Sequence, residues 1–166
     1  MKELRGCMNS DDLYWYNDVL VCDIDDTLIY GKFVAFMDLT WKIFKSPALA
    51  RILSRIQAKF KFYKVHHKIA ELVVQFIING KRVYFLTARG FDISTVDMIN
   101  DIIPTDGFIG TVQLGSKDPS RDKFEWIQSK FDKEKILLID DNLRTRLKCV
   151  ELSNVEAYHP EDLKYG

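Results

Sequence analysis

The sequence VLVCDIDDT, residues 19–27, joins a short apolar run to a cluster of acids. Four consecutive apolar residues, Val19–Cys22, are typical of a strand that is buried on both faces of a parallel sheet. The acids begin at Asp23, where such a strand ends. Ligands of open α/β sheets bind beyond the carboxyl ends of the strands. The stretch therefore predicts an α/β fold with a polar site at the end of its first strand.

Two further apolar runs end in polar clusters. Residues 82–86 lead into Thr87-Ala88-Arg89, and residues 136–139 lead into Asp140-Asp141-Asn142. Helical periodicity separates these runs, and strands that alternate with helices predict parallel strands joined by right-handed crossovers. We therefore expect a doubly wound parallel sheet, with the three polar clusters at one edge of it.

The rest of the chain supplies helices, two weaker strands and a small insertion. Helices are predicted over 33–62 with a break at Ser46-Pro47, over 69–79, over 93–103, over 118–131 and over 143–152. Weaker strands are predicted over 108–114 and 155–158. We expect residues 1–29 and 63–166 to form the α/β core and residues 30–62 to form a small helical cap.

Bulk composition excludes several classes of protein. The chain has 166 residues, 47% hydrophobic and 29% charged, as in an ordinary globular domain. No apolar run approaches the roughly 18 residues that a membrane span needs, and the N-terminus is too polar for a secretory signal. The three cysteines are widely spaced, which indicates neither a disulfide framework nor a zinc site. We expect no membrane span and a cytoplasmic location.

The polar clusters point to phosphate chemistry. Asp23, Asp25, Asp140 and Asp141 would crowd carboxylates into one crevice, and Mg²⁺ is the hard cation that suits such a site. A carboxylate can also act as a nucleophile, and a second carboxyl can protonate a leaving oxygen. Thr87, backbone amides and a lysine would neutralise phosphoryl oxygens. The alternatives are a solvated acidic loop or an EF-hand, but an EF-hand would need glycine and glutamate where Leu28 and Val34 stand.

These motifs resemble those of the haloacid dehalogenase superfamily. Its first motif matches Asp23–Thr27, its second matches Val83–Thr87, and its fourth matches Ile136–Asp141. The resemblance implies that Asp23 is the nucleophile and that Asp25 is the general acid and base, with its backbone carbonyl on Mg²⁺. It also implies that Thr87, with the amide of Ala88, holds phosphoryl oxygens, and that Asp140 and Asp141 bind Mg²⁺. The presence of Asp25 is typical of the phosphatases of the family, because the dehalogenases lack it.

The third motif of that family is a single lysine, and two residues compete for it. Lys123 opens the helix before the last strong strand, and Lys117 lies in the loop before that helix. Residues 121–127 resemble the corresponding helix of polynucleotide phosphatases in the superfamily, which favours Lys123. Either lysine could instead be a solvated surface residue.

The cap region is basic and aromatic. Residues 32–68 hold nine Lys or Arg against one acid, Asp38. Aromatic residues interleave with these cations, namely Phe33, Phe36, Trp41, Phe44, Phe60 and Phe62. Proteins bind single-stranded nucleic acids and nucleotides by stacking aromatic side chains on the bases and by placing cations beside the phosphates. Arg51 and Arg55 are therefore candidates for contacting substrate. Arg89, directly after Thr87-Ala88, is a further candidate that could reach a second phosphate or a sugar oxygen, and its alternative role is that of a structural ion-pair partner.

We expect a Mg²⁺-dependent phosphomonoesterase that acts on a nucleotide or a nucleic-acid terminal phosphate. A phosphatase for another small phosphorylated metabolite and a non-catalytic module of the same fold remain as alternatives. A phospho-receiver domain is a further alternative, but its acidic pair follows the first strand, whereas Asp140-Asp141 follows a late one. The cap aromatics would alternatively pack on the core with the lysines in water, or the cap would lie on an anionic membrane surface.

Overall fold

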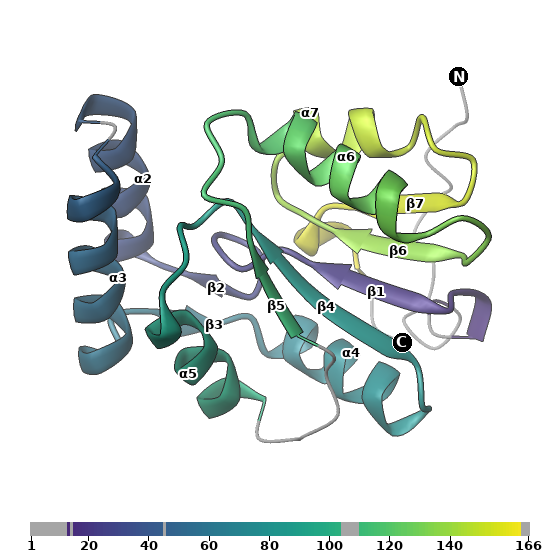
Figure 1. Ribbon diagram of the computed structural model, residues 1–166. Helices are drawn as coiled ribbons and strands as arrows, with labels where there is room; N and C mark the ends of the chain where they lie inside the picture. Colours follow the sequence, from purple (N-terminus) through teal and green to yellow (C-terminus); the bar gives the residue numbers. More distant parts are fainter. Residues whose placement is uncertain (1–12, 14, 45, 104–109, 164–166) are drawn as a thin grey trace.

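Five parallel strands form a single sheet in the order β5-β4-β1-β6-β7 (Figure 1). The computed structural model describes residues 13, 15–44, 46–103 and 110–163. In chain order the strands are β1 Val19–Cys22, β4 Arg82–Thr87, β5 Gly110–Gln113, β6 Ile136–Ile139 and β7 Val155–Tyr158. Every neighbouring pair is parallel, so all five carboxyl ends lie at one edge. The predicted parallel α/β fold is confirmed.

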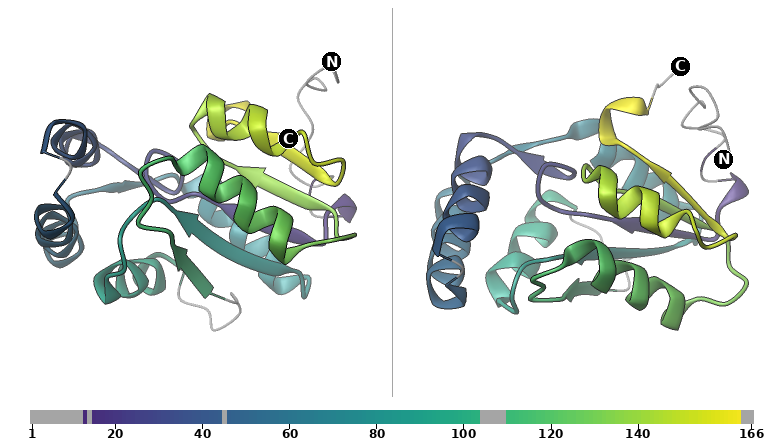
Figure 2. Two further views of the ribbon diagram at one scale, coloured as in Figure 1. Left: turned by 45° about the horizontal axis from the view of Figure 1, so that its top comes forward. Right: turned by 90° about the horizontal axis from the view of Figure 1, so that it is seen from above.

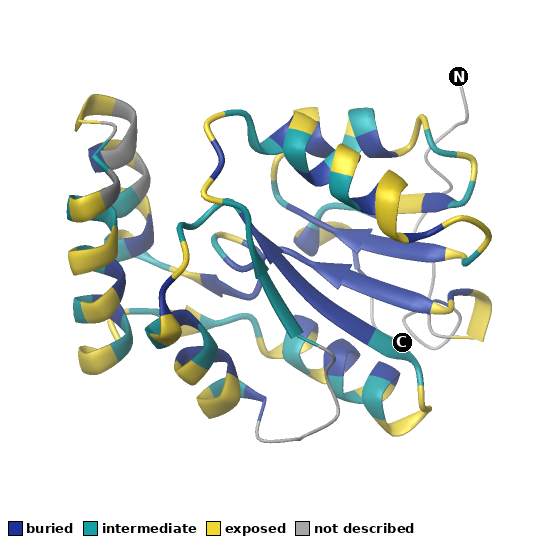
Figure 3. Ribbon diagram, viewed as in Figure 1, coloured by how far each residue is buried: buried dark blue, intermediate teal, exposed yellow. Residues whose placement is uncertain are grey.

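The central strand is buried on both of its faces. Val19 and Val21 belong to one apolar core, and Leu20 and Cys22 belong to the core on the opposite face. Successive side chains of a strand point to opposite faces, so a strand covered on both sides has no polar positions. This arrangement explains the continuous apolar run in the sequence, and Figure 3 shows the central strands as buried along their length.

Helices cover both faces of the sheet, as in a Rossmann-like fold. α4 His67–Ile78 and α5 Ile93–Ile102 contribute Phe76 and Met98 to one core. α6 Pro119–Lys130 contributes Ile127 to the other core, and α7 Leu143–Cys149 contributes its last residue. None of the described helices is both long enough and apolar enough to cross a membrane.

Four helices begin at residues whose side-chain oxygens accept a backbone N–H of the first turn, namely Ser46, Asp92, Asp118 and Asn142. Such caps satisfy donors that the helix itself leaves unpaired. Some predicted bounds were too generous. The last helix was expected to reach residue 152 but ends at Cys149, where i→i+3 backbone bonds tighten the chain into turns. The strand expected over 108–114 covers Gly110–Gln113, and residues 104–109 lie outside the described part of the chain.

A helical insertion, α2 Lys32–Phe44 and α3 Pro47–Phe60, separates β1 from α4. The insertion stands on a short antiparallel ladder in which β2 Ile29–Tyr30 pairs with β3 Lys64–Val65. The ladder was not predicted, because two-residue strands give no periodic signal. Both helices lie beyond the carboxyl edge of the sheet, with α3 nearer to α5 (Figures 1 and 2).

Candidate active site

Three adjacent strands bring polar side chains to one place. β1 lies between β4 and β6 in the sheet. Asp23 follows β1, Thr87 ends β4 and Asp140 follows β6. These three residues are 8%, 1% and 0% exposed. The edge of the sheet therefore holds a buried polar cluster, whereas a solvated acidic loop would leave its carboxylates in water.

Lys123 of α6 enters this cluster and links two strand ends. Its Nζ lies 2.9 Å from Asp23 Oδ1 and 2.7 Å from Asp140 Oδ2, and its side chain is 3% exposed. Asp140 Oδ1 also accepts the N–H of Asn142 at 2.9 Å, which fixes the carboxylate. Lys117, the competing lysine, is exposed. The tertiary structure thus places Lys123, and not Lys117, in the cluster.

Three carboxylates meet closely enough to share one cation. Asp23, Asp140 and Asp141 each offer an oxygen, and these oxygens lie within 4.8 Å of one another. Lys123 supplies one positive charge to the cluster, so three ionised carboxylates would leave two negative charges in excess. An all-oxygen set with this charge suits a hard divalent cation such as Mg²⁺. The carboxylate of Asp25 lies outside this group and binds an arginine, and the expectation that the backbone carbonyl of Asp25 binds the metal stays a prediction.

Burial is the main cause of the raised pKa values of the carboxylates in the cluster, and neighbouring carboxylates add to it. Burial raises the pKa of Asp23 well above its ordinary value, Lys123 opposes this shift, and Asp140 adds to it. Burial, together with the negative charge of Asp140, raises the pKa of Asp141 to about 6. Burial acts to lower the pKa of Lys123, but its two carboxylate partners raise it instead. A buried carboxylate whose pKa is raised is one whose charge is incompletely compensated, and a divalent cation would compensate it.

Asp25 is held by an arginine from the loop after β4, the strand that neighbours β1 in the sheet. Arg89 Nε donates to Asp25 Oδ2 at 2.7 Å, and Arg89 Nη2 donates to Oδ1. Arg89 is 7% exposed on its side chain, and Nη2 also donates to Gln57 Oε1 of α3 at 2.7 Å. This bidentate pair joins the loop after β1, the loop after β4 and the helical insertion.

Backbone contacts fix the loops that carry the cluster. Thr87 Oγ1 accepts the N–H of Arg89 at 3.2 Å. Ala88 O accepts the N–H of Ser116 at 3.1 Å, which joins the loops after β4 and β5. Thr27 Oγ1 accepts the N–H of Asp141 at 3.1 Å and so joins the loops after β1 and β6. The strand ends are therefore held in register by hydrogen bonds between segments that are far apart in the sequence.

The basic residues of the insertion divide into two kinds. Arg51 is exposed, whereas Arg55 Nε lies 3.0 Å from Asp92 Oδ2. Asp92 is the cap of α5, and its side chain is 1% exposed, so Arg55 ties the insertion to the core. Arg51 is thus the better candidate of the two for contacting an external anion.

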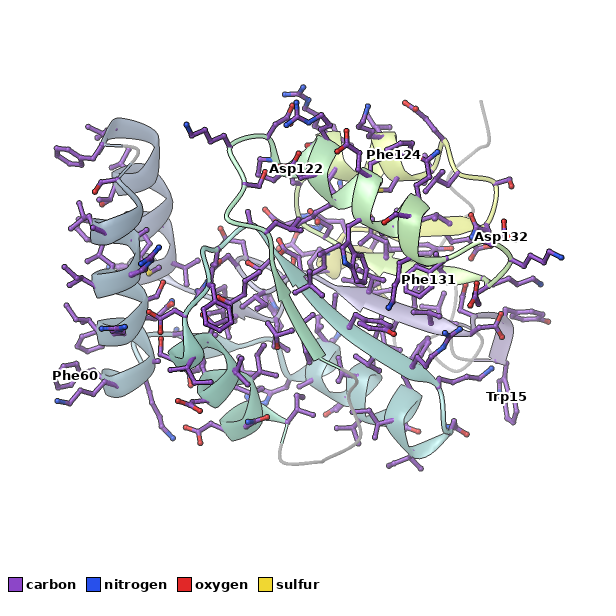
Figure 4. All side chains as sticks on the ribbon, in the orientation of Figure 1. Trp15, Phe60, Asp122, Phe124, Phe131 and Asp132 are labelled. Atoms are coloured by element: carbon purple, nitrogen blue, oxygen red, sulfur yellow. The ribbon has the colours of Figure 1, made fainter. Side chains whose placement is uncertain are left out.

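Aromatic side chains of the insertion lie largely in solvent. Phe36, Phe44, Phe60 and Phe62 are 51%, 65%, 57% and 48% exposed. Phe60 lies on the side of α3 away from the sheet (Figure 4), where its ring stacks on Phe62 with 5.5 Å between centroids. Lys59 Nζ lies 5.6 Å from the Phe60 ring. These four rings do not serve mainly to pack the insertion onto the core.

Sequence reasoning did not single out Gln57, which the structure buries completely against Arg89. The sequence shows that Ser54 and Gln57 lie three positions apart and so share one helix face. Only the structure shows that this face is buried. A polar face on a helix that is buried indicates a contact with other polar groups.

Models of known protein families gave no match to this chain, and a search of curated proteins gave none either. The fold and the site nevertheless define the structural class of the protein. The chain is an α/β protein with a Rossmann-like parallel sheet, and three aspartates at the carboxyl edge of that sheet form a group that could hold a metal ion.

Proposed function

We propose that this protein is a Mg²⁺-dependent phosphomonoesterase of the haloacid dehalogenase type, which forms an aspartyl-phosphate (acyl phosphate) intermediate on Asp23 during turnover. One observation carries the proposal. Lys123 Nζ contacts both Asp23 and Asp140, and Asp141 completes a group of carboxylates around the same point. A nucleophilic carboxylate beside a cation and metal-binding oxygens is the arrangement that transfer of a phosphoryl group requires.

Each residue of the site has its own role in the proposed reaction. An oxygen of Asp23 attacks the phosphorus of the monoester, and the bond from phosphorus to the leaving oxygen breaks. Asp25 gives a proton to that leaving oxygen, and it then takes a proton from the water that attacks the phosphorylated Asp23. Inorganic phosphate leaves and the carboxylate is restored. Thr87 and Lys123 bind phosphoryl oxygens, and Mg²⁺ held by the carboxylates would offset the charge that develops on them.

The contact between Asp25 and Arg89 adds a condition to this scheme. Both carboxylate oxygens of Asp25 accept hydrogen bonds from Arg89. A proton on Asp25 requires one of these bonds to open, because a guanidinium only donates. We therefore propose that substrate entering beside the insertion loosens this pair before the leaving oxygen is protonated.

Exposed aromatic and basic side chains favour a nucleotide or the phosphorylated end of a nucleic acid as substrate. Four rings of the insertion are open to solvent, Lys59 lies over the ring of Phe60, and Arg51 is exposed on the same helix as Phe60. Phe91, on the loop that carries Arg89, is 78% exposed. Aromatic rings in this setting bind bases by stacking, and the cations bind phosphates.

Hydrolysis of phenyl phosphate tests the catalytic part of the proposal. We expect turnover with Mg²⁺, no turnover with a chelator, and no turnover by Asp23→Asn even with Mg²⁺. Asp132→Asn, at an exposed acid remote from the cluster (Figure 4), is the matched control and should retain full activity. A protein that accepts phosphate from a small donor and keeps it without turnover would be a receiver, and the proposal would be wrong.

A substrate panel tests the second part. The panel compares nucleoside monophosphates, oligonucleotides with 3′- or 5′-phosphates, and sugar phosphates. Arg51→Glu should slow hydrolysis of phosphorylated oligonucleotides most, and the loss should shrink at high salt. Lys130→Glu, at an exposed lysine of α6, reverses the same charge far from the insertion and should leave the ranking of substrates unchanged. Equal losses on every member of the panel for Arg51→Glu would exclude the insertion as a nucleic-acid surface.

A further inference from the structure

Gln57 is a polar residue that the insertion buries completely. It is 0% exposed, although Arg55 and Lys59 on the same helix are exposed. Ser54, one turn before it, is 6% exposed. α3 therefore presents a polar stripe to the core at the point where it meets Arg89. Burying polar groups costs free energy unless they find partners, so this stripe requires an explanation.

The orientation of the Gln57 amide follows from its neighbour. The amide atom that lies 2.7 Å from Arg89 Nη2 must be the oxygen, because a guanidinium has donors and no acceptor. The nitrogen Nε2 is then the free end of the amide. This nitrogen is buried, and among the described residues it has no hydrogen-bond partner. Almost all buried donors in folded proteins are paired, so an acceptor is expected to reach this one.

The unpaired donor lies beside the group that handles the leaving oxygen. Arg89 Nη2 contacts Gln57 Oε1 and Asp25 Oδ1 at the same time. Nε2 belongs to the same small amide as Oε1, so it lies close to this pair. In the proposed function Asp25 protonates the oxygen of the departing alcohol. The substrate atoms that come nearest to Nε2 are therefore those of the alcohol, and the scissile phosphate lies deeper, at Asp23.

We infer that Gln57 is a specificity-determining residue, whose Nε2–H donates a hydrogen bond to an uncharged oxygen of the substrate alcohol, such as a sugar hydroxyl or ring oxygen. This inference rests on the proposed function and adds the chemistry of the leaving group to it. The charge of Arg89 is already matched by Asp25, so the cation nearest to Nε2 is not available for a second anion. An uncharged amide donor beside a paired cation suits a hydroxyl or ether oxygen. A second phosphate would bring two negative charges next to a cation that is already paired.

Two variants separate a contact with substrate from a role in holding Arg89. Gln57→Met removes both the donor and the acceptor. Gln57→Glu keeps an oxygen for Arg89 but replaces the N–H donor with a second acceptor. If Gln57 only held Arg89, Gln57→Glu would restore activity. If Gln57 donates to substrate, Gln57→Glu should resemble Gln57→Met. Gln128→Glu, at an exposed glutamine of α6, adds the same charge outside the site and is the control.

The experiment compares thymidine 3′- and 5′-monophosphates with phenyl phosphate, which has no sugar oxygen. For the better of the two nucleotides, both Gln57 variants should lower kcat/KM by about 10-fold more than they lower it for phenyl phosphate, as expected for one lost hydrogen bond in a buried site. The control should leave both values within about twofold. Equal losses on all three esters, or restoration by Gln57→Glu, would overturn the inference while leaving the phosphatase activity intact.

Binding separates this inference from the proposed function. Isothermal titration of the same nucleotide into Asp23→Asn protein measures affinity without turnover. Adding Gln57→Met should weaken that affinity by about 10-fold and should weaken the affinity for phenyl phosphate less. If the wild-type protein hydrolyses none of the esters, the proposed function is wrong. The titration then tests by itself whether Gln57 contacts the nucleotide. An affinity for the nucleotide that Gln57→Met leaves unchanged would overturn the inference.

Discussion

Replacing Lys123 with methionine tests the charge balance of the site. Its ammonium lies within 2.9 Å of carboxylates of Asp23 and Asp140, and its side chain is 3% exposed. Methionine keeps most of the length and removes the charge, which leaves the buried carboxylates without their cation. Removing one partner of a buried ion pair costs about 3–5 kcal/mol. For a chain of this size, that loss lowers Tm by roughly 6–20 °C.

Mg²⁺ should restore part of the lost stability. A cation that binds the folded state at about 100 times its Kd adds about 2.7 kcal/mol of stability. In Lys123→Met the carboxylates have one positive charge fewer beside them, so we expect the increment from Mg²⁺ to be larger in the variant than in the wild type. Urea unfolding followed by circular dichroism, with Mg²⁺ and with a chelator, measures both quantities.

Lys130→Met is the matched control for this experiment. Lys130 lies on the same helix and is exposed, so its replacement should change the free energy of unfolding by less than about 0.5 kcal/mol. Two results would refute the reasoning. One is a decrease of less than about 1 kcal/mol in the free energy of unfolding of Lys123→Met. The other is a free energy of unfolding that does not change with Mg²⁺ in either the wild type or Lys123→Met.

Three smaller predictions address other parts of the molecule. Thr87→Val keeps the shape of the side chain but removes the hydroxyl that we propose donates to the phosphoryl group, so kcat/KM for phenyl phosphate should fall about 100-fold, and an unchanged value would exclude Thr87 from the site. Arg55→Met breaks an ion pair with Asp92 in which the arginine side chain is 69% exposed, so the free energy of unfolding should fall by at most about 1 kcal/mol; a larger loss would show that this contact anchors the insertion. Arg82, with backbone N–H groups, lowers the pKa of Glu134 to about 2, so the stability that this carboxylate adds is complete above pH about 4.5 and is lost as the pH falls toward 2. The Tm difference between wild type and Glu134→Gln should therefore shrink over that interval, and a constant difference would contradict the assignment.

The sequence predicted the sheet well because a strand that is buried on both faces has a continuous run of apolar residues. The continuous apolar runs at Val19–Cys22 and Ile136–Ile139 arise because each strand is covered on both faces. Polar residues directly after these runs mark the carboxyl edge, so the sequence pattern was enough to indicate Asp23, Thr87 and the pair Asp140-Asp141. The break predicted at Ser46-Pro47 also rests on a local signal, and the structure shows Ser46 as the cap of α3.

Where local signals were weak, the prediction lost accuracy. The ladder of β2 and β3 has two residues in each strand, too few for a period to show. The insertion was predicted to stay helical to residue 62, but Lys61 adopts the left-handed conformation with φ 50° and ends α3 at Phe60. Such ends depend on which backbone groups find partners, and a propensity pattern does not report that.

Sequence alone determined the order of the elements, the edge of the sheet at which the polar clusters lie and the acids that stand there. The tertiary structure decided which lysine joins those acids, because α6 packs with Lys123 facing the strand ends, whereas Lys117, in the loop before this helix, is exposed. It also decided that Asp25 pairs with Arg89, and that Gln57 reaches this pair from a helix 32 residues earlier in the chain. Periodicity and capping are properties of neighbouring residues, whereas these contacts join segments that meet only when the insertion docks on the core.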